Sequence, residues 1–339
     1  MSLLNRVILT AVALSGVGHA ADAQDQPVEL GPMEVRGSSA GLPQQRQPGS
    51  RLSGDELRMK ASATLGQTLS EELGVSNASF GPGVGLPVLR GLTGSRVRLM
   101  QDGIASHDAS TVSPDHASSL EASLAEEIQV IRGPAVLEYG GGAIGGVVNL
   151  IDNRIPETLP ARPVTGTIEG RYASNGDART TSFRLETGQG LVALHADGFY
   201  RRSSDTEITG DALDIDALIK QFGEDDYITS ADVIENTDAQ AHGGSLGISL
   251  VGNLGFAGAA VNRYENDYGI PPGVHVDLGV VQHVRIQAAQ TRYDFKAELH
   301  DLGDAVPELS LRTGYVRYAH DEFEAGSPGT QFNNEAWEA

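Results

Sequence analysis

The chain has 339 residues, of which 40% are hydrophobic and 20% charged, a balance that excludes a disordered polypeptide. Its formal net charge of −21 argues against nucleic-acid binding, because a phosphate backbone is bound by clustered Lys and Arg. Cysteine is absent, which excludes disulfides, thiol catalysis and Cys-ligated zinc, so a metal ion must be bound by His, Asp or Glu.

Residues 1–23 have the pattern of a signal peptide. Arg6 supplies a positive charge, residues 7–17 are apolar, and residues 21–23 are Ala-Asp-Ala, a small-x-small cleavage site. Cleavage after Ala20 is the close alternative. The apolar stretch is shorter than the about 20 residues that a transmembrane helix needs. We therefore expect an exported chain that has no membrane-spanning helix.

Residues 24–50 are rich in Gln, Pro, Gly and Ser, a composition that predicts a flexible periplasmic tail. One short apolar patch in this tail has extended character. It consists of Leu30, Gly31, Pro32, Met33, Glu34 and Val35. A patch of this kind can add as a strand to the sheet edge of a partner, with main-chain hydrogen bonds supplying most of the affinity.

Residues 51–155 have the mixed pattern of a compact α+β domain. A helix start is expected at residues 53–56, and apolar residues recur on one helical face from Leu65 to Leu73. Strands are expected at residues 87–91, 96–100, 128–131 and 146–151. Together they predict a small mixed sheet with short helices.

From residue 164 to residue 339 apolar and polar residues alternate, most regularly between residues 292 and 299. This alternation is typical of a transmembrane β-barrel, with lipid on one side and water or protein on the other. A soluble β-sandwich also alternates. The barrel is favoured because the runs are about ten residues long and because aromatic residues recur near their ends, at Tyr172, Tyr200, Tyr264 and Tyr318.

The segment 203–240 interrupts this pattern and holds eleven Asp or Glu residues and one Lys. Long loops on one side are usual in outer-membrane barrels, so we expect this acidic segment to be an extracellular loop.

Residues 127–151 form the most distinctive motif. A strand ending in Arg-Gly-Pro is followed by Tyr-Gly, a glycine-rich turn and a strand that begins Gly-Val-Val-Asn. The glycines allow positive φ and close approach of the backbone. A phosphate-binding loop is disfavoured, because neither a Gly-Lys-Ser/Thr ending nor a following helix with an acidic ribose partner is present.

This motif resembles the plug domain of TonB-dependent outer-membrane receptors. Residues 87–92 and 97–104 resemble two other strands of the same domain, and the patch at 30–35 resembles the TonB box. The resemblance implies a plug domain followed by the first strands of an antiparallel transmembrane β-barrel, in a monomer in the outer-membrane lipid of a Gram-negative bacterium. It also implies active uptake of a scarce nutrient by strand pairing with TonB, powered through its inner-membrane complex, with no catalysis and no catalytic cofactor.

The same resemblance gives the charged residues of the plug strands a place. Arg90, Glu127 and Arg132 would bond to the charged barrel wall, and pairs within the plug are the alternative.

The segment 113–116, Ser-Pro-Asp-His, carries the hypothesis for the ligand. Its pattern fits a helix start, in which Asp115 is simply well placed near the N-terminus. It also resembles the plug of zinc-uptake TonB-dependent receptors, and residues 318–322 resemble their barrel segment that carries a carboxylate. The resemblance implies zinc as the transported ligand, bound by Asp115 and His116, with Glu322 as a third ligand and His320 as a further one.

Zinc-uptake receptors can carry a dense cluster of histidines in the loop after a Tyr-Gly-x-Pro segment. In this chain that segment begins at Tyr268, and the loop after it holds only His275 and His283. A siderophore, haem or cobalamin receptor of the same architecture is the alternative, as is a truncated receptor that does not function. A passive porin would lack the box and the plug. An exported hydrolase is disfavoured, because no Gly-x-Ser-x-Gly or His-Glu-x-x-His motif is present.

A barrel wide enough to hold a plug needs about 22 strands, which is several hundred residues. Only 176 residues follow Pro163. We therefore expect an incomplete barrel with seven or eight strands. The resemblance to zinc-uptake receptors implies a further barrel histidine, which would lie outside the sequence.

Overall fold

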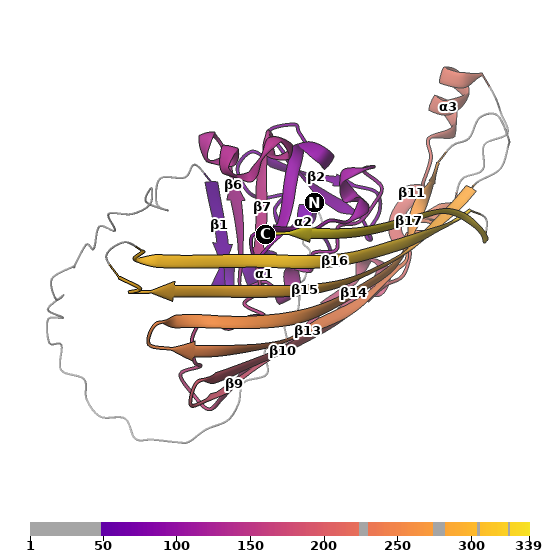
Figure 1. Ribbon diagram of the computed structural model, residues 1–339. Coiled ribbons are helices and arrows are strands. Elements are labelled where there is room, and N and C mark those ends of the chain that lie inside the picture. Colours follow the sequence, from indigo (N-terminus) through magenta and orange to yellow (C-terminus); the bar gives the residue numbers. More distant parts are fainter. Residues whose placement is uncertain (1–48, 224–229, 274–281, 304–305, 325) are drawn as a thin grey trace, which may run out of the picture.

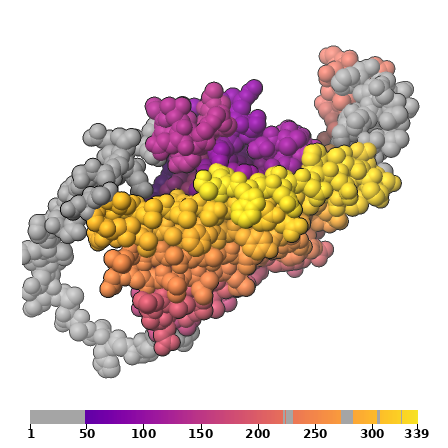
Figure 2. Space-filling model, in the orientation of Figure 1, coloured from indigo at the N-terminus to yellow at the C-terminus, as the bar shows by residue number. Residues whose placement is uncertain are grey.

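The computed structural model describes residues 49–223, 230–273, 282–303, 306–324 and 326–339 (Figure 1). The expected signal peptide, the patch at 30–35 and His275 lie outside these residues. Two parts are described: an N-terminal domain up to residue 155, and a long curved sheet from residue 164 onward. The N-terminal domain lies against one face of that sheet (Figures 1 and 2).

The N-terminal domain is built on a five-stranded sheet. In spatial order its strands are β1 (Gly49–Ser53), β6 (Glu127–Ile131), β7 (Gly146–Ile151), β4 (Val97–Gln101) and β5 (Ile104–Ala105). The pair β4–β7 is parallel and the other pairs are antiparallel. A separate hairpin joins β2 (Val75–Ser79) to β3 (Gly85–Leu89).

Short helices cover this sheet and close its core. The α-helices are α1 (Gly54–Lys60) and α2 (Leu65–Thr68). The 3-10 turns are η2 (Gly94–Arg96), η3 (Ala109–Thr111), η4 (Ala122–Leu124), η5 (Pro134–Tyr139) and η6 (Gly141–Ala143). The core is aliphatic, and among its members Leu65, Leu69 and Ile128 are fully buried. These residues come from the helical face and the strand that the sequence pattern predicts.

The helix expected over residues 65–73 is shorter than the pattern suggests. Helix α2 ends at Thr68, tighter turns continue to Val75, and Leu73 is 88% exposed. The chain turns because Gly74 adopts a positive φ of 72° and leads directly into β2. The prediction was right about the two buried leucines and wrong about Leu73.

The second part is a single antiparallel sheet of eight strands. Along the sheet they are β8 (Val164–Ala173), β9 (Ala178–Gln189), β10 (Val192–Ser203), β13 (Ala239–Gly252), β14 (Gly255–Gly273), β15 (Gln282–His300), β16 (Glu308–Glu324) and β17 (Ser327–Glu338). A 3-10 turn, η7 (Asn175–Asp177), joins the first two. Strands that follow one another in this series are neighbours throughout, which confirms the predicted fold of an α+β domain followed by successive antiparallel strands.

The acidic segment 203–240 has structure of its own. It contains a hairpin of β11 (Thr206–Asp211) and β12 (Ala231–Ile234), with α3 (Ile215–Phe222) between the two strands. In Figure 1 this unit projects away from one end of the long sheet.

The two faces of the long sheet differ in the way that the alternation predicts. Apolar side chains such as Ile168, Leu246 and Leu250 are at least 60% exposed on the outer face. The inner face meets the N-terminal domain and buries polar residues. The four tyrosines proposed as interface aromatics divide between the faces: Tyr172 and Tyr200 are exposed, whereas Tyr264 and Tyr318 are buried against the N-terminal domain. The interface prediction was therefore wrong for Tyr264 and Tyr318, because they occupy inward positions of their strands.

Charged residues connect the two parts. Arg154, which is 1% exposed, donates to Asp152 at 2.6 Å and to Asp294 of β15 at 3.2 Å. Arg201 of β10 donates to Glu121 at 2.6 Å. The inner face thus holds the N-terminal domain by buried ion pairs that have hydrogen-bonded partners on both sides.

The residues that were expected to contact the barrel wall do not make these pairs. Glu127 pairs with Arg51, and Arg132 donates to Leu73 and Ser50, all within the N-terminal domain. Arg90 is exposed at the end of β3. The alternative of pairs within the domain is therefore correct for Glu127 and Arg132.

Among the described residues, every helix is too short or too polar to span a membrane.

Candidate functional site

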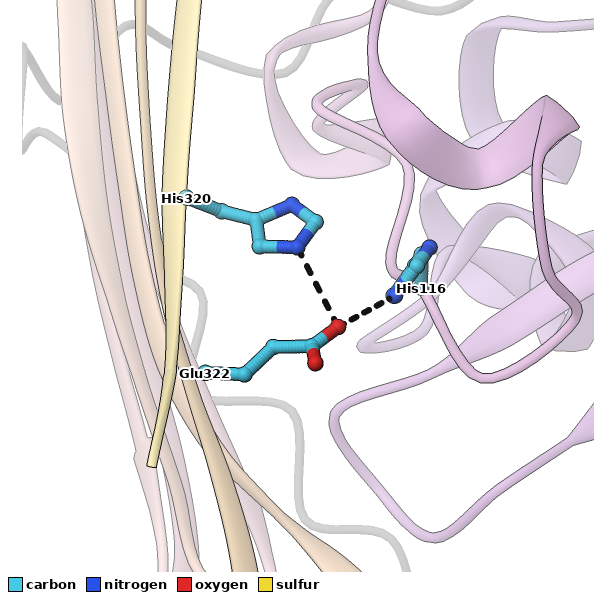
Figure 3. Close-up of side chains that lie close together, drawn as sticks. All are labelled: His116, His320 and Glu322. Carbon is cyan, nitrogen blue, oxygen red and sulfur yellow. Dashed lines mark hydrogen bonds and ion pairs between the residues drawn. The ribbon is translucent and has the colours of Figure 1, made fainter. Parts of the chain in front are cut away.

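The candidate site lies where the N-terminal domain meets β16. His116 comes from the loop after η3, whereas His320 and Glu322 come from β16 (Figure 3). Residues two apart on a strand point to the same face, so the alternation of β16 directs both side chains inward. Figure 3 shows the three side chains converging from the two parts of the molecule.

The three residues offer donor atoms at close range. Nε2 of His116 lies 3.1 Å from Oε1 of Glu322, and Nε2 of His320 lies 3.4 Å from the same oxygen. The two imidazole centroids are 4.7 Å apart. In a tetrahedral zinc site with bonds of about 2.0 Å, neighbouring donor atoms are about 3.3 Å apart. The separations therefore suit three ligands of one small metal ion.

Burial distinguishes this group from a chance meeting of polar residues. The side chains of His116 and His320 are 4% and 0% exposed. Nε2 of His320 is buried and has no hydrogen-bond partner. An unsatisfied buried nitrogen costs free energy unless it has a ligand. Glu322 is 18% exposed, so the group is open to solvent on its side.

Surrounding groups fix both imidazole rings. Nδ1 of His116 donates to the carbonyl oxygen of Ala109 at 3.2 Å, and Nδ1 of His320 lies 2.9 Å from the hydroxyl of Tyr318. The ring of Phe332, on the neighbouring strand β17, packs at centroid distances of 4.6 Å from His320 and 5.7 Å from His116. Both rings consequently direct Nε2 toward the carboxylate of Glu322. This orientation is the one in which the two imidazoles and the carboxylate could bind the same metal ion.

Asp115 takes another role in the structure. Its carboxylate accepts a hydrogen bond from the hydroxyl of Ser113, and it does not belong to the converging group of His116, His320 and Glu322. Of the four residues that the resemblance named, the structure brings these three together.

The helix expected from Ser113 is absent from this described segment, and that prediction was wrong. A single turn is closed by the N–H of His116 on the carbonyl of Ser113. The following N–H groups bond elsewhere, because Ala117 donates to the hydroxyl of Tyr268 and Ser119 donates to the carboxylate of Asp108. These tertiary partners replace the carbonyls that a continuing helix would use.

The structure also shows residues around the site that sequence reasoning did not assign to it. Tyr318 and Phe332 contact the imidazoles, and the peptide of Ala109 supports one of them. The only sequence signal for Tyr318 is its position two residues before His320, which gives both residues the same face of the strand. Nothing in the sequence pattern connects Ala109 or Phe332 with the histidines.

A second group of metal-ligand types, Glu298, His300 and Glu308, lies at the opposite end of β15 and β16. His300 is 45% exposed and its Nε2 lies 3.3 Å from Glu298. His283 is paired with Glu235 at the surface. Because these groups are exposed, water can satisfy them, and they serve best as controls for the buried site.

Comparison with known proteins agrees with the sequence motifs and the fold. Residues 43–147 match the family model described as the TonB-dependent Receptor Plug Domain. Over 181 residues, 52% of this chain, the chain is 29% identical to the vitamin B12 transporter BtuB of Photobacterium profundum, of which the match covers 29%. Over 60 residues, 18% of the chain, it is 40% identical to the ferric enterobactin receptor PirA of Pseudomonas aeruginosa, of which the match covers 8%.

Solved structures share the fold at low sequence identity. The FrpB iron transporter from Neisseria meningitidis superimposes with a TM-score of 0.60 at 12% identity, covering 82% of this chain and 43% of that one. The copper transporter OprC superimposes with a TM-score of 0.58 at 16% identity, covering 81% of this chain and 37% of that one. The chain thus spans less than half the length of these relatives.

The N-terminal domain therefore matches the model of the TonB-dependent receptor plug domain and is called the plug below, and the plug and the long sheet together share the fold of the FrpB iron transporter. The structure thus consists of a plug domain followed by an antiparallel sheet of eight strands.

Proposed function

We propose that this chain belongs to a receptor for active uptake of zinc, or of a zinc complex, across the outer membrane of a Gram-negative bacterium. The cargo would bind between plug and barrel at His116, His320 and Glu322. One observation carries the choice of cargo: two buried imidazoles and a carboxylate converge, and Nε2 of His320 has no hydrogen-bond partner.

The donor set favours a borderline divalent cation. Imidazole nitrogen and carboxylate oxygen are ordinary ligands of zinc, and three protein ligands leave a fourth position for water or a chelating group of the cargo. Copper(I) prefers sulfur ligands, and none of the three converging residues offers sulfur. The same donors would also accept copper(II), so competition between the two ions belongs in the test.

The site lies on two parts of the molecule, which suits release by movement of the plug. A metal ion bound by all three residues would link the plug to β16. Withdrawal of the plug would remove His116 from the other two ligands and weaken the site. We propose that TonB drives this movement by pairing with residues 30–35, after the signal peptide has been removed.

The chemistry of the chain supports an uptake role in the outer membrane. The exposed apolar outer face of the sheet suits lipid, and the acidic segment 203–240 would raise the local concentration of cations. The relatives that share its fold or sequence are named transporters or receptors, which supports transport over catalysis.

A siderophore, haem or cobalamin cargo is the competing function. It is supported by the names of the relatives, which include a vitamin B12 transporter and a ferric enterobactin receptor. Large cofactors and siderophores need an aromatic or arginine-lined pocket, whereas the buried group of this chain is small and rich in metal ligands.

The test is a zinc titration of the detergent-solubilised chain with a chromophoric competitor. We expect one tight site, which His320→Ala weakens at least about 100-fold through loss of one ligand. The control is His300→Ala, which removes a histidine from the exposed group at the other end of β16's partner strand and should change the affinity less than twofold. Equal zinc affinity in His320→Ala and the unmodified chain would contradict the proposal.

A further inference from the structure

One residue of the plug, Ala109, contacts His116 directly and also contacts Tyr318, the neighbour of His320. The carbonyl of Ala109, in η3, accepts from Nδ1 of His116 at 3.2 Å. A carbonyl can only accept, so Nδ1 of His116 carries a hydrogen and its Nε2 faces Glu322. Ala109 also packs against Tyr318 in one buried cluster.

The hydroxyl of Tyr318 contacts Nδ1 of His320, just as the carbonyl of Ala109 contacts Nδ1 of His116. The phenol oxygen lies 2.9 Å from Nδ1 of His320. A metal ion bound at Nε2 of His320 requires the ring hydrogen on Nδ1, where the phenol oxygen of Tyr318 can accept it. This arrangement leaves the lone pair of Nε2 free for a metal ion.

Packing holds Tyr318 in this position. Ala109, Tyr318 and Ala288 form one buried cluster, in which each residue is at most 7% exposed. Ala288 is the cross-strand partner of His320 on β15. The phenol ring is thus enclosed between the plug and the sheet, and its hydroxyl has little freedom to leave Nδ1 of His320.

We propose that Tyr318 is a positioning residue of the metal site, and that Ala109 and Tyr318 together hold both imidazoles in the metal-binding orientation. This inference rests on the proposed function. Hydrogen-bond partners of metal-ligating histidines fix the tautomer and ring orientation, and their loss weakens metal binding by about 10- to 100-fold.

The two contacts of Ala109 have a consequence for release. Both imidazoles have the correct support only while η3 lies against β16, because Ala109 contacts His116 directly and His320 through Tyr318. A shift of η3 therefore disturbs two ligands at once. The metal site responds to the position of the plug even before His116 itself has moved away.

The test compares Tyr318→Phe with Tyr264→Phe in the detergent-solubilised chain. Tyr264 is the matched control, since it is also a buried tyrosine of the inner face, but it packs with Leu124, Phe199 and Ala241 in a different cluster. Zinc affinity should fall by about 10- to 100-fold in Tyr318→Phe and change less than threefold in Tyr264→Phe. Thermal unfolding of each variant shows whether it is folded.

A second readout would not respond to a merely structural role. Long-range ¹H–¹⁵N spectra of the metal-free chain report which nitrogen of each histidine is protonated. We expect His320 to have the same tautomer in the unmodified chain and in Tyr264→Phe, and a different tautomer population in Tyr318→Phe. This readout applies even if Tyr318→Phe is less stable, provided that its spectrum is dispersed.

The outcomes separate this inference from the proposed function. If the unmodified chain binds zinc, and Tyr318→Phe binds it equally well or keeps the His320 tautomer, the positioning role is wrong and the zinc site stands. An equal loss of affinity in Tyr264→Phe would also overturn the positioning role. If the unmodified chain does not bind zinc, the proposed function fails and this inference fails with it.

Discussion

Two neighbouring carboxyl groups of the plug, Asp102 and Asp152, have pKa values that are shifted in opposite directions. Burial and the charge of Asp152 raise the pKa of Asp102 well above its usual range, despite the nearby Arg154. Burial acts in the same direction on Asp152, but Arg154 and the hydrogen bond from Asp102 more than offset it and lower its pKa. Of the two carboxyl groups, Asp102 therefore takes up a proton first as pH falls.

Charge balance explains this arrangement. Three carboxylates (Asp102, Asp152 and Asp294) surround Arg154, and Asp294 also accepts from Arg292. Three negative charges against two positive charges leave an excess of one in a poorly hydrated place. A proton on Asp102 makes the group neutral, which burial favours.

The first prediction concerns Asp102→Asn. A carboxyl group whose pKa is raised by folding stabilises the protein below its unfolded pKa of about 4, and this contribution is lost as pH rises through the folded pKa. Asn imitates the protonated form and tolerates the positive φ of 50° at this position. We expect Asp102→Asn to be more stable than the unmodified chain above the folded pKa and equally stable near pH 4, as measured by urea unfolding of the chain in detergent.

The second prediction has the opposite sign. Asp152 accepts from Arg154 at 2.6 Å and from Gln101 at 2.8 Å, so its charged form is the one that the fold binds. Asp152→Asn should lower the free energy of unfolding at pH 7 by about 3 kcal/mol, because it leaves Arg154 short of a partner. Since the pKa of Asp152 is lowered, this difference should shrink as pH falls through that pKa. A stabilising Asp152→Asn would refute the proposed proton distribution.

The sequence predicts the three converging residues of the candidate site better than the groups that surround them. His116, His320 and Glu322 were found by local resemblance of two short segments, and the structure brings them together. Asp115 is adjacent to His116 in sequence but bonds Ser113, because the turn at this point directs the two side chains apart. Tyr318 could not be assigned, since its contact with the plug depends on a packing that no local pattern contains.

At the scale of elements, glycines of the inner face allow a close approach of the plug to the sheet. A Cβ atom added to Gly247 of β13 would lie 1.7 Å from the carbonyl oxygen of Arg154. The contact is with backbone, which cannot move aside as a flexible side chain can. Gly247 therefore allows the segment after β7 to lie directly on the sheet.

The third prediction follows from this contact. Gly247→Ala should destabilise the docking of the plug by about 1–3 kcal/mol through overpacking. Hydrogen exchange of the amides at residues 152–155 should accelerate in this variant. Gly252→Ala on the same strand is the control, because an added Cβ there meets no atom within 4 Å. Equal exchange in both variants would show that the plug does not need this close approach.

Strands of the long sheet were the elements best predicted from sequence. The alternation along each strand has a single cause, because one face of the sheet is apolar and exposed and the other faces the plug. The helix at residues 65–73 and the helix start at Ser113 were overestimated. Short helices in the plug depend on which tertiary groups take the next N–H, as Tyr268 does for Ala117. Local patterns do not contain that information.

At the scale of the whole molecule, the proposed function has the cargo bound between the plug and the long sheet, so binding and transport can be tested separately. The fourth prediction is that deletion of residues 30–35 abolishes zinc-dependent growth of cells that rely on this receptor, while zinc affinity of the purified protein stays the same. Deletion of six residues elsewhere in the tail, 37–42, is the control and should leave growth intact. Uptake that survives the first deletion would contradict the TonB-dependent mechanism.

The class of the molecule was predicted from sequence more firmly than its cargo. The motif at residues 127–151 forms β6, the glycine-rich turn and β7, which are the centre of the plug sheet. That motif does not include any residue of the candidate metal site, and it gives no information about the cargo. The cargo depends on residues from two distant segments, of which each one alone is an ordinary loop or strand.

Anomalous diffraction from the zinc-loaded protein at the zinc absorption edge tests the central claim most directly. We predict one strong peak between plug and β16, within about 2.0–2.2 Å of Nε2 of His116, Nε2 of His320 and a carboxylate oxygen of Glu322. A peak only at Glu298, His300 and Glu308, or no ordered zinc at all, would contradict the account.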